Sequence, residues 1–472
     1  MMEKPEALIG KVTLLCGVIV VMTTVVVPDW SLINPVLLAV GVMMALCLVR
    51  IPVPVAIIIA ALLGGVHSGM TLTDVIGTMN DHLQPGAEVG ITYAMVGAYA
   101  MAIFRTGLIE HFSQWFERFI QNGKTNRVRL KIILVFGVIG ALSQTLIPIH
   151  IAFMPILIPP LLGTFNKLQL DRRLLACLLV CVISMTYLTI PFGFGGIFLK
   201  GIMAPAINAT AQHYGFMVTE DQLVGSMLIP AAGILVGLMI SVFWSHRRPR
   251  SYESINISHQ SPLERKTTIT DHVYVLLSII VVVLIQLYYD SIMLGAILGF
   301  LILSLTGQVQ WKEQDSLFTD GMRMMVQISI IITIASGFAG VLKATGGIDA
   351  LVSSSVGWIS RHREIAVLLM LVIGFIITIG FGDSFANVPI LAPIYLPLCF
   401  ESGFSLAATI IMLGASAALG DAGSPASTLT LGVTSGLNAD GQHDLVKDTI
   451  LPTMFHANIG LMLFAWLAVM YI

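Results

Sequence analysis

The sequence predicts an all-α polytopic membrane protein with about 11 transmembrane helices, and three observations support this fold class. First, 56% of the 472 residues are hydrophobic and only 11% are charged, against roughly a quarter in a soluble domain. Second, the mean hydropathy of +0.91 is too high for a soluble chain with a single core. Third, the apolar runs are continuous, whereas the strands of an outer-membrane barrel alternate in polarity. A soluble enzyme, a nucleic-acid-binding protein and a disordered chain are excluded, and the net charge of −2 implies no polyanionic partner.

The apolar segments follow one another along the chain with short polar turns between them. A crossing helix needs about 20 apolar residues, and four of the segments are interrupted in the middle by Gly, Pro or polar residues. The uninterrupted spans are 11–27, 33–49, 51–68, 87–105, 222–245, 271–288, 290–306, 323–342 and 449–471, and the interrupted segments are 131–163, 173–207, 364–400 and 404–437.

Two halves of the chain resemble each other on either side of the polar linker 246–270. The sequence TGLIE at 106–110 matches TGGID at 345–349, and IAFMPILIP at 151–159 matches FANVPILAP at 385–393. The matches keep the same order, which indicates an inverted repeat. We therefore divide the chain into N-terminal spans (1–50), a first repeat (51–245), the linker, a second repeat (271–445) and a C-terminal span (446–472).

Positive charges predict the topology of these segments. Segment 131–163 has Lys and Arg on both flanks, which the positive-inside rule places in the cytoplasm. It should therefore be a re-entrant hairpin with arms of about 15 residues, too short to cross alone. Segment 364–400 should be a second hairpin that enters from outside, and 173–207 and 404–437 should be broken helices. This topology places the N-terminus inside, the C-terminus outside, and every Lys and Arg near the cytoplasm except Lys200, Lys343, Arg361 and Arg363. The amphipathic stretches 108–122 and 347–360 should lie along opposite surfaces.

The four interruptions should meet near the middle of the membrane, because broken helices in lipid survive only where they line a protein-enclosed or wet cavity. Asp383 is the strongest candidate, since a carboxylate at the bilayer centre costs several kcal/mol (about 2.5–3.5) unless it is paired or wet. No basic residue lies near it in sequence, so a bound cation or proton should neutralise it. Asp421 sits in the break GDAGSPAST at 420–428. Each Asp could instead cap the half-helix that follows it. The ion-binding candidates of this half are Asp383, Ser384, Asn387, Asp421, Gly423, Ser424 and Ser427, and those for direct Na⁺ ligation are Asp383, Asn387, Asp421 and Ser424.

The first half carries no carboxylate at its breaks. Its candidates are Ser143, Gln144, Thr145, His150 and Gly193. His150 is either a proton carrier or a core histidine. Gly193 allows either close approach of the backbone to a ligand or tight helix packing. Cys177 and Cys181 share a helix face but have no His or carboxylate near them in sequence, so we expect them to be packing residues.

These motifs resemble the NhaC-type Na⁺/H⁺ antiporter family of the ion transporter superfamily, over about residues 10–470. The chain is most similar to the YuiF-like branch, which is predicted to carry amino acids such as histidine. The resemblance implies a scaffold, a mobile transport domain with two hairpins and two broken helices, elevator-like alternating access and a homodimer. Dicarboxylate transporters of the superfamily carry Ser-Asn-Thr at the hairpin tips. This chain has Ser143-Gln144-Thr145 and Asp383-Ser384 there, which favours a cation or an ammonium-bearing substrate over a carboxylate.

The sequence therefore predicts a secondary active transporter of a bacterial-type inner membrane and not an enzyme. The leading function is Na⁺/H⁺ antiport, with Na⁺ and H⁺ as coupling ions, no other cofactor, and membrane lipid as the surroundings. The alternative is Na⁺- or H⁺-coupled transport of an amino acid. A channel is a more distant alternative, because hairpins that meet tip to tip leave no continuous pore. An intramembrane hydrolase is another, although Asp383 and Asp421 lie at helix breaks rather than in mid-helix.

Overall fold

The computed structural model describes residues 33–49, 51–108, 115–116, 118–119, 125–145, 150–253 and 269–472. Within these ranges the chain is helical and forms no strand. Ten of the described helical stretches are long and apolar enough to cross a membrane. This confirms the predicted class of all-α polytopic membrane protein. The predicted span 11–27 and most of the stretch 108–122 lie outside the described residues.

The helices follow the predicted segments closely. Those of the first half are α2 (Pro35–Leu48), α3 (Val53–His67), α4 (Leu72–Asp81), α5 (Gln84–Arg105), α7 (Thr125–Thr145), α8 (His150–Lys167), α9 (Arg172–Thr189), α10 (Phe194–Gly196), α11 (Ala204–Ala211) and α12 (Glu220–Ile240). Those of the second half are α13 (Ile269–Tyr289), α14 (Ile292–Leu305), α15 (Gln314–Ala344), α16 (Gly347–Arg361), α17 (Arg363–Phe381), α18 (Ser384–Glu401), α19 (Leu406–Ala418), α20 (Thr428–Leu437), α21 (Leu451–Thr453) and α22 (Ile459–Tyr471). The described part of the chain also has π-helical turns at Ile197–Met203, Ser241–Ser245, Leu445–Ile450 and Met454–Asn458.

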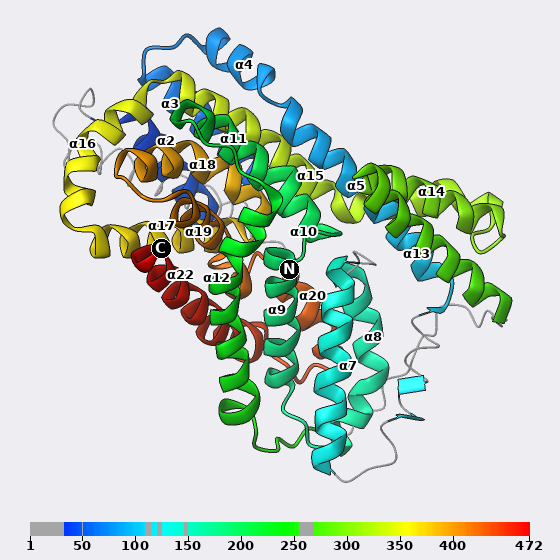
Figure 1. Ribbon diagram of the computed structural model, residues 1–472. Helices are drawn as coiled ribbons and strands as arrows, with labels where there is room; N and C mark the ends of the chain where they lie inside the picture. Colours follow the sequence, from blue (N-terminus) through cyan, green and yellow to red (C-terminus); the bar gives the residue numbers. More distant parts are fainter. Residues whose placement is uncertain are drawn as a thin grey trace, which may run out of the picture.

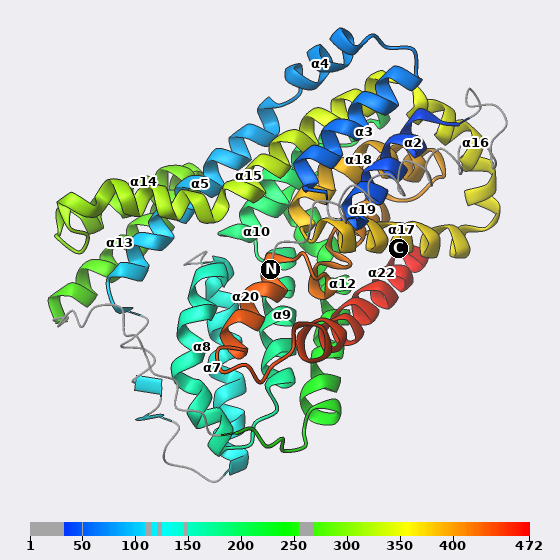
Figure 2. The ribbon, with the colours of Figure 1, turned by 180° about the vertical axis from the view of Figure 1, so that it is seen from behind.

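Helices α5 and α15 lie side by side and form a long ridge, with α3 and α4 toward one end and α13 and α14 at the other (Figure 1). Glycine permits this contact: a Cβ on Gly97 would lie 2.4 Å from the carbonyl oxygen of Gly321, and a Cβ on Gly321 would meet Gly97 in the same way. Small residues at a helix crossing let two backbones approach closely. Helices α7, α8, α9 and α20 form a separate group beside this ridge (Figure 2).

Near the centre, helices of the first half of the chain pack against helices of the second half. Helix α8 of the first half packs against α20 of the second, and α18 of the second half packs against α11 of the first. The α8–α20 contact is tight, since a Cβ on Gly436 would lie 2.5 Å from the carbonyl oxygen of Met154. A two-fold repeat would produce such contacts, and the repeat stays a prediction.

The helices that form the predicted hairpins are longer than expected. Helices α7 and α8 have 21 and 18 residues, against the predicted 15 or so, and α17 and α18, for which no arm length was predicted, have 19 and 18. The added length comes mainly from polar flanks such as 125–130, which favour the helix although they lie outside the apolar run. At 1.5 Å per residue, each arm is about 27–32 Å long, comparable with the hydrocarbon thickness of a bilayer. The argument that these arms are too short to cross was therefore wrong.

Two further features were not expected from the sequence. Helix α4 fills the predicted turn between two spans, and the capping box of Thr71 and Asp74 starts it. The described beginning of the linker, 246–253, packs onto the helices instead of hanging free: Arg250 forms an ion pair with Asp448 (2.7 Å), and the Tyr252 hydroxyl accepts a hydrogen bond from the Arg172 backbone (3.0 Å). Residues 254–268 of the linker lie outside the described part.

Candidate functional site

Asp383 lies at the start of α18, where the second hairpin turns. Its Oδ1 accepts hydrogen bonds from the backbone N–H groups of Phe385 (2.8 Å) and Ala386 (2.9 Å). Asp383 is therefore an N-cap, as one alternative expected. The helix N-terminus also stabilises the negative charge. Both capping bonds use the same carboxylate oxygen, and Asp383 lines the cavity described below, so capping is compatible with binding a cation.

Asp421 lies in the break between α19 and α20 and is 7% exposed. Its two oxygens accept hydrogen bonds from Ser384 Oγ (2.8 Å) and Ser427 Oγ (2.6 Å). Ser384 also bonds to the hydroxyl of Tyr187 (2.9 Å), so a chain of hydroxyl groups runs from α9 to Asp421. Ser427, and not Asp421, caps α20, because its Oγ accepts from Leu429 N–H (3.1 Å). The prediction that Asp421 could cap the following half-helix was wrong, since Ser427 takes that role.

Ser424, Asn387 and Gly423 hold the hairpin tip against the break. Ser424 Oγ donates to the carbonyl of Ile379 (2.8 Å), and Asn387 Nδ2 donates to Thr378 Oγ1 (2.8 Å). Gly423 and the adjacent Gly420 are covered by the C-terminal helix, as Asn458 Oδ1 accepts from Gly420 N–H (3.2 Å) and a Cβ on Gly423 would meet Met454 and Asn458. These residues join helices and do not line the cavity between the two carboxylates. The assignment of Ser424 and Asn387 as Na⁺ ligands stays a prediction, and the buried Asn387 Oδ1 has no hydrogen-bond partner among the described residues.

The end of α7 meets the break after α9 through the backbone. Gly193 has φ +62°, and a Cβ there would lie 2.2 Å from the carbonyl oxygen of Gln144 and 2.5 Å from that of Thr145. Close approach at Gly193 is therefore to the first hairpin. Ser143 and Thr145 turn their hydroxyl groups back to α7, donating to the carbonyls of Gly140 (2.7 Å) and Ala141 (3.2 Å). The Gln144 side chain is buried and lines the same cavity as the two carboxylates. The side chain of His150 is outside the described part of the structure.

A small cavity of about 30 Å³ lies where these breaks meet, large enough for one or two water-sized particles. Both carboxylates line it together with Gln144 from the first hairpin. The full lining is Tyr93, Gln144, Ile183, Tyr187, Phe194, Ile328, Asp383, Phe385, Asp421, Thr428 and Leu429. Among the described residues, no Lys, Arg or His lies within ion-pair distance of either carboxylate.

Aromatic rings cover one side of this cavity. The ring of Phe385 contacts those of Tyr93 (5.7 Å between centroids), Tyr187 (5.4 Å) and Phe198 (5.1 Å), and Tyr93 also contacts Phe194 (5.1 Å). We call Tyr93, Phe194 and Phe385 the aromatic layer. All three are at most 8% exposed.

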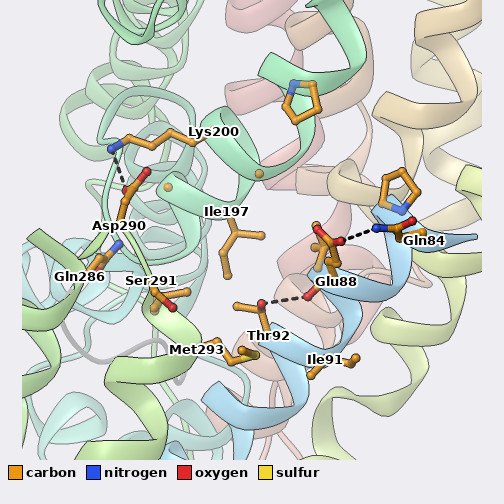
Figure 3. Close-up of a pocket in the computed structure, with 16 residues that line it drawn as sticks. Gln84, Glu88, Ile91, Thr92, Ile197, Lys200, Gln286, Asp290, Ser291 and Met293 are labelled. Carbon is orange, nitrogen blue, oxygen red and sulfur yellow. Dashed lines mark hydrogen bonds and ion pairs between the residues drawn. The ribbon is translucent and has the colours of Figure 1, made fainter. Parts of the chain in front are cut away.

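A second, wider cavity of about 890 Å³ is lined by residues of α5, of the π-helical turn Ile197–Met203 and of the start of α14 (Figure 3). Val89 lines the wide cavity, and Tyr93, one turn further along α5, lines the small one. Gly196 also lines the wide cavity, and Phe194, two residues earlier, lines the small one. The aromatic layer therefore separates the two cavities.

The wide cavity carries charged groups of both signs. Lys200 forms ion pairs with Asp290 (3.3 Å) and with Glu220 (2.9 Å), while Glu88 accepts a hydrogen bond from Gln84 (3.1 Å) (Figure 3). Glu88 and Asp290 share this cavity although they lie about 200 positions apart in the sequence, so no local motif indicates it.

The helical fold and the buried carboxylate cavity define a multi-pass membrane transporter. Comparison with known families gives the same class. A family model described as "Na+/H+ antiporter family" matches residues 179–466, and one described as "Na+-H+ antiporter family" matches residues 34–120. The chain belongs to the Na⁺/H⁺ antiporter family.

The chain is also similar to other membrane proteins in sequence and in fold. An uncharacterised membrane protein of Vibrio parahaemolyticus is 42% identical over 93% of this chain and 99% of its own length. A Bacillus subtilis protein, YuiF, named as a candidate amino acid transporter, is 40% identical over 92% of this chain and 99% of its own. The fold is similar to that of the YdaH transporter of Alcanivorax borkumensis (TM-score 0.59, 13% identity, 84% of this chain and 88% of that one). It is equally similar to MtrF of Neisseria gonorrhoeae, described as illuminating a class of antimetabolite efflux pumps (TM-score 0.59, 13% identity, 85% of both chains).

Proposed function

We propose that this protein is a secondary active transporter of the bacterial inner membrane and that Asp383 and Asp421 form its cation site. The observation that carries the proposal is the placement of two carboxylates on one small cavity with no basic partner among the described residues. Two buried like charges are unstable without compensation, and a bound cation or proton supplies it. The protein is therefore most stable when the site is loaded.

The oxygen atoms at this cavity suit Na⁺ and H⁺ equally. Carboxylate, amide and hydroxyl oxygens are hard ligands, which favour hard cations. We assign Asp383, Asp421, Gln144 and Thr428 as the groups around the ion, with Ser384 and Ser427 holding Asp421 in place. Competition of Na⁺ and H⁺ for the same carboxylates gives antiport when only the loaded site changes its access from one side of the membrane to the other.

The second candidate is cation-coupled transport of an amino acid, and the wide cavity favours it. Its volume of about 890 Å³ falls within the usual range for small-molecule sites. Lys200 and Glu88 supply opposite charges that match the carboxylate and ammonium groups of a zwitterion. The name given to the Bacillus relative points the same way. In this case the cation at Asp383 and Asp421 would drive uptake of the organic substrate.

Alternating access requires that the small cavity open to one side at a time. The aromatic layer closes it toward the wide cavity, which supports a carrier over an open channel. We propose an elevator-like movement of the hairpins and broken helices of the two repeats, 51–245 and 271–445, against a scaffold, in a homodimer. The N-terminus would lie in the cytoplasm and the C-terminus outside, as the Lys and Arg distribution predicts.

Proteoliposomes with a trapped pH dye test the proposal. The purified protein is exposed to an inward Na⁺ gradient, first alone and then with single amino acids. Proton efflux with Na⁺ alone supports antiport. Proton or Na⁺ movement only after an amino acid is added, with matching uptake of radiolabel, supports the second candidate. A response that is unsaturable and proportional to the gradient would instead indicate a channel and contradict the proposal.

A further inference from the structure

Three side chains with metal-ligating atoms, none of which lines the carboxylate cavity, meet near the beginning of the linker. They are Cys177 of α9, His246 just after the π-helical turn Ser241–Ser245, and His456 of the π-helical turn Met454–Asn458. One ligand atom from each lies within 4.8 Å of the other two. No sequence motif indicates this cluster, because 69 and 279 residues separate Cys177 from the two histidines.

His246 is the decisive member of the cluster. It is 8% exposed, and among the described residues neither of its ring nitrogens has a hydrogen-bond partner. A neutral imidazole has one nitrogen with a lone pair that can bind a metal. A buried imidazole with both nitrogens unpaired is unfavourable unless something absent from the protein chain binds it. Metal ligation by one nitrogen removes that cost.

His456 is oriented as a metal ligand should be. Its Nδ1 lies 2.6 Å from the carbonyl oxygen of Pro452, and because a carbonyl only accepts, Nδ1 carries the hydrogen. Nε2 then has the lone pair, which accepts a hydrogen bond from Ser245 Oγ (2.9 Å); a metal would take the place of this hydroxyl. Metal-bound histidines almost always donate their second N–H in this way to a carbonyl or a carboxylate. Asp171 Oδ2, 3.8 Å from His246 Nδ1, is placed to do the same for the other histidine after a small rotation of its ring.

Tight packing fixes the helices that carry the cluster. A Cβ on Gly237 of α12 would lie 1.7 Å from the carbonyl oxygen of His456, and Gly233 and Gly460 meet in the same manner one turn away. The ligand atoms therefore need only rotations of side chains to move from 4.8 Å to the roughly 3.5 Å expected between ligands of a tetrahedral Zn²⁺.

We propose that Cys177, His246 and His456 form a binding site for Zn²⁺, with water in the fourth position. One thiolate and two imidazoles are the ligands that Zn²⁺ prefers among the common divalent cations. Arg173 and Arg129 lie close by, but Arg173 is paired with Asp171, and Arg129 donates to the backbone carbonyls of Val242, His246 and Arg247. The thiolate and Asp171 supply the negative charge that the metal needs.

The site is tested with the full-length protein, purified in detergent and treated with a chelator. Co²⁺ is added as a spectroscopic substitute for Zn²⁺, because a cobalt–thiolate bond gives a charge-transfer band in the near ultraviolet. Zn²⁺ affinity is measured by competition with a coloured chelator. We expect one Co²⁺ or Zn²⁺ per chain and a thiolate band that Zn²⁺ abolishes.

Substitutions then assign the ligands. C177S should remove the band, and H246Q and H456Q should each lower Zn²⁺ affinity by at least about 100-fold, since a direct ligand contributes more than the 10–100-fold of an outer-shell group. C181S is the matched control, because Cys181 is equally buried one turn along α9 and is not part of the cluster. Elution volume and thermal melting confirm that each variant is folded. Binding that is absent in the wild-type protein, or equal in C177S and C181S, would overturn the proposal.

Discussion

The substitution Asp383→Asn separates the two roles of this residue in one step. Asp383 caps α18 by accepting two backbone hydrogen bonds through Oδ1, and it presents its charge to the small cavity. Asparagine is as good an N-cap as aspartate, so D383N keeps the cap and removes only the charge. We expect D383N to fold and to lose Na⁺-dependent transport.

The size of the effect follows from the charge alone. A carboxylate and a cation about 4 Å apart attract each other by about 4 kcal/mol at an effective dielectric constant of about 20. Since 1.4 kcal/mol corresponds to a factor of ten, D383N should lower Na⁺ affinity by about 1,000-fold. In wild-type protein, Na⁺ at ten times its Kd should stabilise the folded state by about 1.4 kcal/mol, and D383N should lose this stabilisation.

The assay combines Na⁺-driven proton flux in proteoliposomes with thermal melting at increasing Na⁺ and constant ionic strength. D383A is the matched variant, because it removes both the cap and the charge and should cost about 1 kcal/mol of stability more than D383N. Choline in place of Na⁺ controls for ionic strength. If D383N transports normally and its melting temperature still rises with Na⁺, the reasoning is refuted and the cation site lies elsewhere.

Three further outcomes test other parts of the structure. Gly382→Ala should abolish folding or transport, because φ at Gly382 is +69° and the added Cβ would lie 2.5 Å from the backbone of the 420–428 break. Gly69→Ala is the matched control: φ there is +94° but the space is open, so thermal melting should show a loss of only about 1 kcal/mol in stability. Arg172→Gln should lower stability by about 3–5 kcal/mol, because it leaves the Asp440 carboxylate buried without its partner; a shift in melting temperature no greater than that of a surface Arg variant would contradict this. Acidification from pH 6.5 to 4 should destabilise the protein. Burial lowers the pKa of His443 to about 4 in the folded state, so the unfolded state takes up a proton first as the pH falls. His443→Gln should reduce the loss of stability over this pH range by up to about 3 kcal/mol.

The sequence was informative about where helices break but not about which side chains meet there. Gly and Pro residues marked the interruptions after α9, α17 and α19, since few other residues break an apolar helix. The cost of a charge in lipid singled out Asp383, and the structure places this residue on the small cavity. The bond between Tyr187 and Ser384 joins residues 197 positions apart and could not be predicted, because it depends on how α9 packs against α18.

Local alternatives were also undecidable from the sequence alone. The break at 420–428 holds one aspartate, two serines and a threonine, any of which suits an N-cap, and only the backbone path made Ser427 the cap and left Asp421 free for Ser384. Cys177 looked like a packing residue for the same reason: nothing near it in sequence suggested a ligand, and the two histidines arrive from other helices.

The aromatic layer bears on how well a driving gradient is preserved. A transporter wastes its gradient whenever an ion passes without completing the cycle. Tyr93, Phe194 and Phe385 are buried and ring-packed, so an uncomplexed ion that enters from the wide cavity meets a hydrocarbon-like barrier before it reaches a carboxylate. Three side chains that bind no ion would then decide how much of the stored gradient performs work and how much is lost as leak.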